Sequence, residues 1–113
     1  MRSLPLIALS VALCCMAQAQ TAYRMSVAAV GACAAADASS SWGRVELNPV
    51  LAGSGQRFDG RSVALKAGIT GAILGVGWLV QRHRPEARRA VTVGNWVTSA
   101  AWCGAAAHNW AAR

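Results

Sequence analysis

Stretches of about 20 apolar residues alternate with short charged connectors along this 113-residue chain. The clearest stretch is residues 62–81, SVALKAGITGAILGVGWLVQ, in which Lys66 is the only charged residue. About 20 consecutive apolar residues form a helix long enough to cross the hydrocarbon core of a bilayer. Because only helices and closed barrels satisfy their backbone groups in lipid, this pattern predicts an all-α fold whose helices span a membrane.

The composition favours the same interpretation. Hydrophobic residues make up 55% of the chain and charged residues only 13%, compared with about 25% charged residues in an average soluble domain. A soluble domain of this size has a large surface to cover with polar groups, so the small number of charges argues against one. The apolar residues are mainly Ala, Val and Leu interspersed with Gly, which is typical of helices packed closely in lipid.

The N-terminal residues 1–19 have the three parts of a secretory signal peptide. Arg2 supplies a positive start, an apolar run extends to Met16, and the Ala-Gln-Ala sequence at 17–19 fits the small-x-small pattern of a cleavage site. We expect cleavage there, leaving residues 20–113 as a single helical membrane domain of the bacterial cytoplasmic membrane. An uncleaved anchor is the alternative, because a second apolar segment follows closely.

Two further segments complete a predicted small helical membrane bundle of about three spans. Residues 22–42 have the length of a span, but Ala, Gly and Ser dominate and Asp37 lies near one end, so this segment needs neighbouring helices to stay inserted. Residues 90–109 form the last span and are again rich in small residues. In this layout Lys and Arg divide equally between the two membrane faces, so the positive-inside rule leaves the orientation open. If residues 22–42 do not span, the four-arginine connector 82–89 changes sides.

The net charge of +7 does not indicate nucleic-acid binding. The arginines lie mostly between apolar segments, whereas a phosphate-binding surface clusters its charges on one face. The basic residues are therefore interpreted as determinants of membrane topology, and we expect no nucleic-acid partner.

The four cysteines divide into two pairs by position. Cys14 and Cys15 lie in the predicted signal peptide and leave with it on cleavage. Cys33 and Cys103 each lie inside an apolar stretch, without the spacing of a metal or redox motif. We interpret them as two small buried hydrophobes, although a disulfide is chemically allowed in an exported protein.

A polar cluster is the candidate site. The predicted layout brings the ionisable residues Asp37, Lys66 and His108 to one membrane face, with Glu46 and Asn48 in the adjoining loop. Ionisable groups within a membrane are costly and are commonly functional. The structural alternative is an ion pair between Asp37 and Lys66 that fixes how two weakly apolar helices meet.

A stripe of small residues on the clearest span is the candidate surface for helix packing. It consists of Gly68, Gly71, Ala72 and Gly75 and includes a Gly-x-x-x-Gly motif. In lipid such a stripe favours close contact between helices. Four glycines would weaken a soluble helix by nearly 1 kcal/mol each relative to Ala, which favours a membrane helix.

No sequence motif indicates an enzyme. His108 has no second His or Cys at ligand spacing, so we predict no metal site. A phosphate-binding loop, a dinucleotide fingerprint, a haem attachment motif and the serine nucleophile patterns are all missing from the sequence. We therefore predict a protein that is not an enzyme and carries no cofactor.

A set of short motifs in residues 33–80 resembles a known family. The motifs are Asp37 followed by Ser40, then Gly43, Glu46-Leu47-Asn48-Pro49, and Lys66 at the start of the next span. This pattern is similar to a family of small uncharacterised bacterial multi-pass membrane proteins with an Asp-bearing helix followed by a Glu-x-Asn-Pro loop. The first helix departs from that pattern because it is rich in Ser and Ala. The resemblance implies a membrane protein and supplies no reaction.

The predicted function is that of a structural or interaction component of the bacterial cytoplasmic membrane. Its partners would be the lipid bilayer and, since three weak spans offer little area to one another, other membrane helices or further copies of the chain. Two alternatives remain open. One is a membrane-embedded site protein, such as a small transporter or proton-handling subunit, that uses the polar cluster. The other is an exported soluble helical protein.

Overall fold

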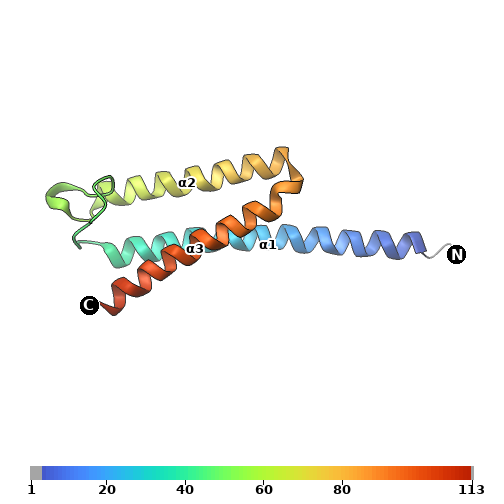
Figure 1. Ribbon diagram of the computed structural model, residues 1–113, viewed down its shortest axis with the longest axis horizontal. Coiled ribbons are helices and arrows are strands. Elements are labelled where there is room, and N and C mark those ends of the chain that lie inside the picture. Colours follow the sequence, from blue (N-terminus) through green and yellow to red (C-terminus); the bar gives the residue numbers. More distant parts are fainter. Residues whose placement is uncertain (1–3, 113) are drawn as a thin grey trace.

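The computed structural model describes residues 4–112 and contains three helices (Figure 1). These are α1 (Leu4–Ser41), α2 (Gly60–His83) and α3 (Arg88–Ala111), and two short 3-10 helices, η1 (Ser54–Gln56) and η2 (Pro85–Ala87), lie in the connections. The described residues form no strand beyond an isolated bridge between Val45 and Arg57. The predicted all-α fold is therefore confirmed.

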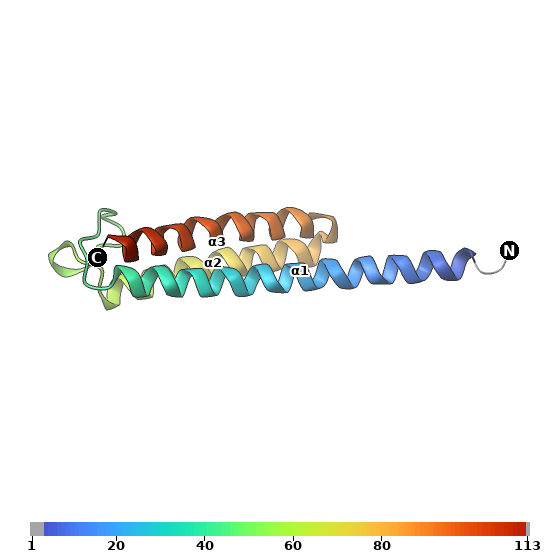
Figure 2. The ribbon, with the colours of Figure 1, turned by 90° about the horizontal axis from the view of Figure 1, so that it is seen from below.

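The helices run up, down and up. Helices α1 and α3 run in the same direction and pack against each other, and α2 runs in the opposite direction beside this pair (Figures 1 and 2). The loop of residues 42–59 closes one end of the bundle, and η2 closes the other. The N-terminal part of α1 extends alone beyond the connector end, so the molecule is elongated, with extents of 72 × 29 × 16 Å.

The predicted first span, residues 22–42, is the second half of a longer helix. Helix α1 continues without a break from the predicted signal peptide to Ser41. Residues 6–19 are all exposed, whereas the buried residues of α1 begin at Tyr23. Only the part of α1 after the predicted cleavage site therefore contributes to the bundle interior.

Helices α1 and α3 pack along a seam of small and polar residues. Buried or half-buried positions recur at alternating intervals of three and four residues, which is the spacing of a coiled-coil seam. On α1 these positions are Tyr23, Ser26, Val30, Cys33, Asp37 and Ser40, and on α3 they are Thr92, Asn95, Ser99, Trp102, Ala106 and Asn109. Because most of these side chains are small, the two backbones approach closely.

A disulfide joins the two helices near the middle of this seam. Cys33 and Cys103 are bonded, with Cα atoms 4.8 Å apart and a sequence separation of 70. The prediction of two unpaired hydrophobes is therefore wrong. Parallel packing places the two residues at the same level of adjacent helices, and their wide separation in sequence gives no sign of this.

Helix α2 has its polar residues inside and its apolar residues outside. Its buried residues are Ser62, Lys66 and Gln81. Its exposed large hydrophobic residues are Ile69, Ile73, Val76, Trp78, Leu79 and Val80. Helices α1 and α2 are long and apolar enough to cross a membrane. Helix α3 equals α2 in length but does not reach the same hydropathy, since Thr92, Asn95 and Ser99 lie along it.

Candidate functional site

A cavity of about 370 Å³ lies at the loop end of the bundle and collects most of the predicted polar cluster. Asp37, Glu46, Asn48 and Lys66 all line it. The cavity also receives Arg44, Leu51 and Phe58 from the loop and Trp102, Ala105 and Asn109 from α3. His108 does not line it, because its side chain lies on an exposed face of α3.

Lys66 is the centre of this site because it contacts the other two helices. Its Nζ atom forms an ion pair with an Asp37 carboxylate oxygen of α1 at 2.5 Å. The same atom lies 4.6 Å from the centre of the Trp102 ring of α3, within the range of a cation–π contact. The two charged side chains are 9% and 13% exposed. One lysine therefore joins three helices through polar contacts.

The Glu-Leu-Asn-Pro segment folds into a turn that uses its own polar atoms. The Asn48 backbone N–H donates to Glu46 Oε1 at 2.9 Å, and Asn48 Oδ1 accepts from the Val50 N–H at 3.0 Å. The Asn48 carbonyl accepts from the backbone of both Leu51 and Ala52. Asn side chains commonly stabilise turns in this way. Glu46 and Asn48 therefore shape the cavity wall.

Arginine side chains fix the loop against the helices. The Arg44 guanidinium donates to the Asn109 carbonyl of α3 at 2.6 Å, which satisfies a carbonyl in the last turn of that helix. The Arg57 guanidinium donates to the Gly43 carbonyl at 2.6 Å and crosses the loop. Between them Phe58, only 2% exposed, closes the cavity from the loop side. The cavity therefore has an ordered wall.

Asp59 ends the loop and starts α2. Its carboxylate accepts from the backbone N–H groups of Arg61 and Ser62, and the Ser62 hydroxyl accepts from the Asp59 N–H, which is a capping box. The Ser62 backbone hydrogen bond lowers the pKa of Asp59 below its ordinary value of 3.8. A Cβ added to Gly53 would overlap the Asp59 carboxylate, so the loop requires glycine there.

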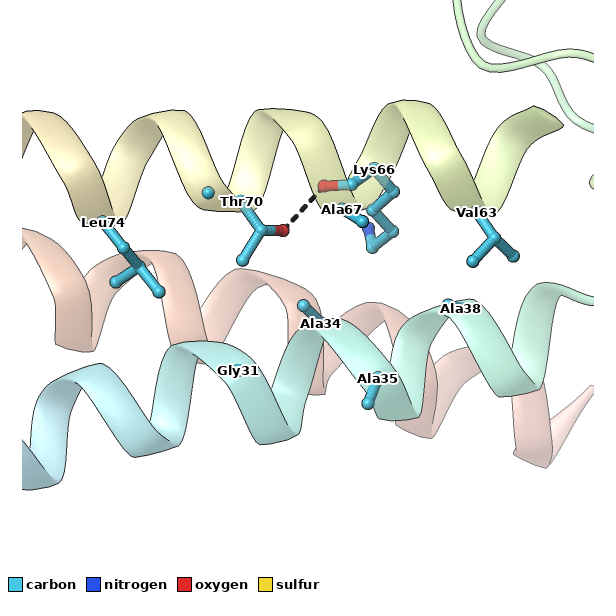
Figure 3. A pocket seen from close by; sticks show the side chains of 10 residues that line it. Gly31, Ala34, Ala35, Ala38, Val63, Lys66, Ala67, Thr70 and Leu74 are labelled. Carbon is cyan, nitrogen blue, oxygen red and sulfur yellow. Dashed lines mark hydrogen bonds between the residues drawn. The ribbon is translucent and has the colours of Figure 1, made fainter. Parts of the chain in front are cut away.

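A second hollow, between α1 and α2, is almost entirely apolar. It has a volume of about 370 Å³ and is lined by Gly31, Ala34, Ala35, Ala38, Val63, Lys66, Ala67, Thr70, Gly71 and Leu74 (Figure 3). Val63, Thr70 and Leu74 of α2 point toward the small residues of α1 in this view. Lys66 lines both hollows and separates the apolar groove from the polar cavity.

The residues of the predicted packing stripe are exposed on α2, where Gly71 lines the hollow beside α1 and Ala72 lines a groove beside α3. A Cβ added to Gly68, Gly71 or Gly75 would meet nothing within 4 Å, and Ala72 is exposed. No other described residue of the chain packs closely against these glycines. Small residues occur at close helix contacts along the α1–α3 seam and at Gly77 of α2, where an added Cβ would lie 3.0 Å from Val91 Cγ1 of α3.

The polar cavity is lined by side chains of opposite charge. Two cations and two carboxylates line the polar cavity, and one pair is already in contact. Within residues 4–112, no three His, Cys, Asp or Glu side chains lie close enough to hold a metal ion. The cavity can therefore stabilise a polar or charged group through Lys66, Asp37, Arg44 and Glu46.

Sequence reasoning missed three residues of this site, namely Arg44, Trp102 and Asn109. Each belongs to the site through a long-range contact that short motifs do not reveal. One usable signal is the seam itself, because Trp102 and Asn109 fall at its three-four spacing on α3.

Asn95 shows how the seam uses its polar groups. Asn95 donates to the Ser26 hydroxyl of α1 at 3.1 Å and so joins two helices, whereas Thr98 donates to the Gly94 carbonyl of its own helix.

No family model matches this chain, and no curated protein or solved structure matches it either.

Proposed function

We propose that this protein is a small integral protein of the bacterial cytoplasmic membrane that acts as a structural or interaction component. One observation supports the proposal most directly: the buried residues of α2 are polar, and its large apolar residues are exposed. Its buried residues Ser62, Lys66 and Gln81 are all polar, while its large apolar side chains are exposed. In water this arrangement would expose a large apolar surface, whereas in a bilayer the same side chains would contact apolar lipid tails.

The bundle interior supports the same proposal. Its buried residues include Ser26, Ser40, Asn95 and Ser99, and no buried polar side-chain atom among the described residues lacks a hydrogen-bond partner. Helices in lipid associate through small residues and hydrogen bonds because lipid tails provide no hydrophobic drive between them. A soluble bundle of this size would need a larger apolar interior.

The predicted signal peptide fits this architecture. Residues 6–19 contribute no buried residue, so cleavage after Ala19 would leave the packed seam intact. The disulfide is compatible with export, since such bonds persist in oxidising compartments. Sequencing the mature N-terminus tests this step, and we expect it to begin at Gln20.

Alkaline carbonate extraction of bacterial membranes tests membrane integration. The chain with a C-terminal tag should stay in the membrane pellet, as a known multi-pass protein does in the same sample. The variant Ile69→Lys/Leu79→Lys serves as a matched control, because both side chains are exposed and neither lies in the space between α2 and α3. It should be released or degraded. Release of the wild-type chain would refute the proposal and favour the exported soluble alternative.

A membrane-embedded site protein is the second candidate, and the Lys66 cavity favours it. The cavity brings an ion pair, two further charges and an aromatic ring together at one end of the bundle. Such a site suits a small transporter or a proton-handling subunit. The Asp37 and Glu46–Pro49 motifs resemble those of a family of small membrane proteins, and this resemblance is compatible with either candidate function.

Paired substitutions separate the two candidates. Asp37→Ala alone leaves Lys66 without its partner, and breaking a buried pair costs about 3–5 kcal/mol. The double variant Asp37→Leu/Lys66→Met removes both charges and keeps similar volumes. If the pair is structural, the single variant lowers protein abundance and the double variant restores both abundance and the wild-type growth phenotype. Restored abundance with the phenotype of a deletion strain would instead establish a functional site.

A further inference from the structure

The two ends of the bundle differ in charge. The loop end carries three of the four acidic residues, Asp37, Glu46 and Asp59, among its basic residues. The connector and the adjoining ends of α2 and α3 carry Arg82, Arg84, Arg88 and Arg89, with Glu86 as the single acid of residues 82–89. The connector end therefore has a net positive charge that the chain itself does not balance.

The connector arginines also have free donors. At the loop end Arg44, Arg57 and Arg61 each donate to a backbone carbonyl. At the connector Arg82 lies over the Trp78 ring, and Arg88 donates to Gln81 Oε1 at 3.1 Å. The Arg84 and Arg89 side chains form no hydrogen bond or ion pair with any residue of the described range 4–112. Their guanidinium groups are available to an external anion.

An apolar groove leads to these arginines. It lies between α2 and α3, has a volume of about 520 Å³, and is lined by Ala72, Ile73, Val76, Gly77, Val80, Val91, Gly94, Asn95 and Thr98. The two helices separate with distance from the connector (Figure 1). Val80 also lines a smaller hollow that includes His83 and Arg84. The apolar groove and the hollow that includes Arg84 therefore adjoin at Val80.

We infer that this surface binds an anionic phospholipid, with one acyl chain in the α2–α3 groove and its phosphate on Arg84. The inference rests on the proposed membrane location. A guanidinium binds phosphate oxygens through two parallel hydrogen bonds, and basic pockets between membrane helices recognise anionic headgroups. Charge complementarity therefore favours a lipid anion over an apolar helix as the occupant.

Two substitutions separate the headgroup contact from the acyl-chain contact. Arg84→Gln removes the phosphate partner and leaves the groove unchanged. Gly94→Leu fills the groove, and a Cβ at Gly94 would meet nothing within 4 Å, so the change is compatible with the fold. Each has a matched control that lies outside the site. Arg24→Gln removes one exposed, unpaired arginine of α1, and Gly75→Leu adds the same side chain to the outer face of α2.

The experiment is native mass spectrometry of the full chain in detergent with phosphatidylglycerol or phosphatidylcholine added. We expect one phosphatidylglycerol per chain to be retained in preference to phosphatidylcholine. Arg84→Gln should weaken phosphatidylglycerol binding by about five-fold, the effect of one arginine near an anionic surface, and leave phosphatidylcholine binding unchanged. Gly94→Leu should weaken both lipids, and both control variants should bind as the wild type does.

Three results would overturn the inference. Equal loss in Arg24→Gln and Arg84→Gln would show diffuse attraction by net charge. Full binding by Gly94→Leu would place the acyl chain outside the groove. A bound polypeptide displaced by Gly94→Leu would identify a protein occupant. These outcomes differ from failure of the proposed function, because a chain that is not a membrane protein would be released by carbonate and bind neither lipid.

Discussion

Asn95 of α3 donates a hydrogen bond of 3.1 Å to the Ser26 hydroxyl of α1, and both side chains are buried. The Ser26 hydroxyl in turn donates to the Tyr23 carbonyl, and the Ser99 hydroxyl donates to the Asn95 carbonyl. Four seam residues thus form one chain of hydrogen bonds inside the bundle. The four side chains are uncharged, so this part of the bundle interior is polar but carries no charge.

A double-mutant cycle on Ser26 and Asn95 measures the strength of this contact. Ser26→Ala and Asn95→Leu should each destabilise the protein, and the coupling energy between them should be about 0.6 kcal/mol, the average for hydrogen bonds between membrane helices. Denaturation in mixed micelles followed by circular dichroism provides the free energies. Ser39→Ala is the control, since the Ser39 hydroxyl bonds within its own helix. A coupling energy of zero would contradict the observed geometry.

Removal of the Cys33–Cys103 disulfide should lower stability substantially. The bond closes a loop with a sequence separation of 70 residues, for which loop-closure entropy predicts a contribution of about 4 kcal/mol. The Cys33→Ala/Cys103→Ala variant should therefore unfold at a clearly lower temperature or denaturant concentration than the wild type. The wild type measured before and after reduction is the control, because Cys14 and Cys15 are unpaired and leave with the predicted signal peptide. Equal stability of wild type and the Cys33/Cys103 variant would refute the pairing.

Gly77 marks the close approach of α2 and α3, and Gly75 does not. A Cβ at Gly77 would lie 3.0 Å from Val91 Cγ1, whereas one at Gly75 would meet nothing within 4 Å. Gly77→Leu should therefore destabilise the protein by about 1–3 kcal/mol relative to Gly75→Leu, the usual cost of overpacking. Both variants gain the same helix propensity, which cancels in the comparison. Thermal unfolding in detergent measures the difference, and equal unfolding temperatures would contradict the α2–α3 contact.

The Asp59 cap should make α2 sensitive to acid. Because its folded-state pKa is lowered below the ordinary value of 3.8, the ionised carboxylate contributes stability that is present above that value. This contribution is lost as the pH falls through the lowered pKa. Unfolding temperatures should therefore fall more in the wild type than in Asp59→Asn between about pH 5 and pH 2. An amide oxygen caps a helix without titrating. Identical pH profiles would contradict the cap.

The helices were predictable because their residues form long apolar stretches between polar breaks. The predicted spans at 62–81 and 90–109 lie within Gly60–His83 and Arg88–Ala111. The sequence did not predict that α1 and α3 would pack against each other more tightly than α2 packs against either. Hydropathy ranks α2 as the strongest helix, yet α1 and α3 form the tight pair, because their seam is built from small polar residues.

The site was predictable in part because its members approach one end of the bundle in any up-down-up arrangement. Asp37, Lys66, Glu46 and Asn48 follow from that topology alone. His108 does not, because its position depends on how α3 is rotated about its own axis. One helical residue corresponds to a rotation of about 100°, so Asn109 lines the cavity and its neighbour His108 is exposed.

The bond between Cys33 and Cys103 also makes residues 33–103 a covalent macrocycle. Helix α2, the loop that carries the Glu-Leu-Asn-Pro turn and the arginine-rich connector all belong to this ring, whereas the start of α1 and the end of α3 extend from it as two tails. A single backbone cut anywhere in the ring releases no fragment until the disulfide is reduced. A backbone cut in the loop at residues 42–59 therefore leaves all three helices covalently joined.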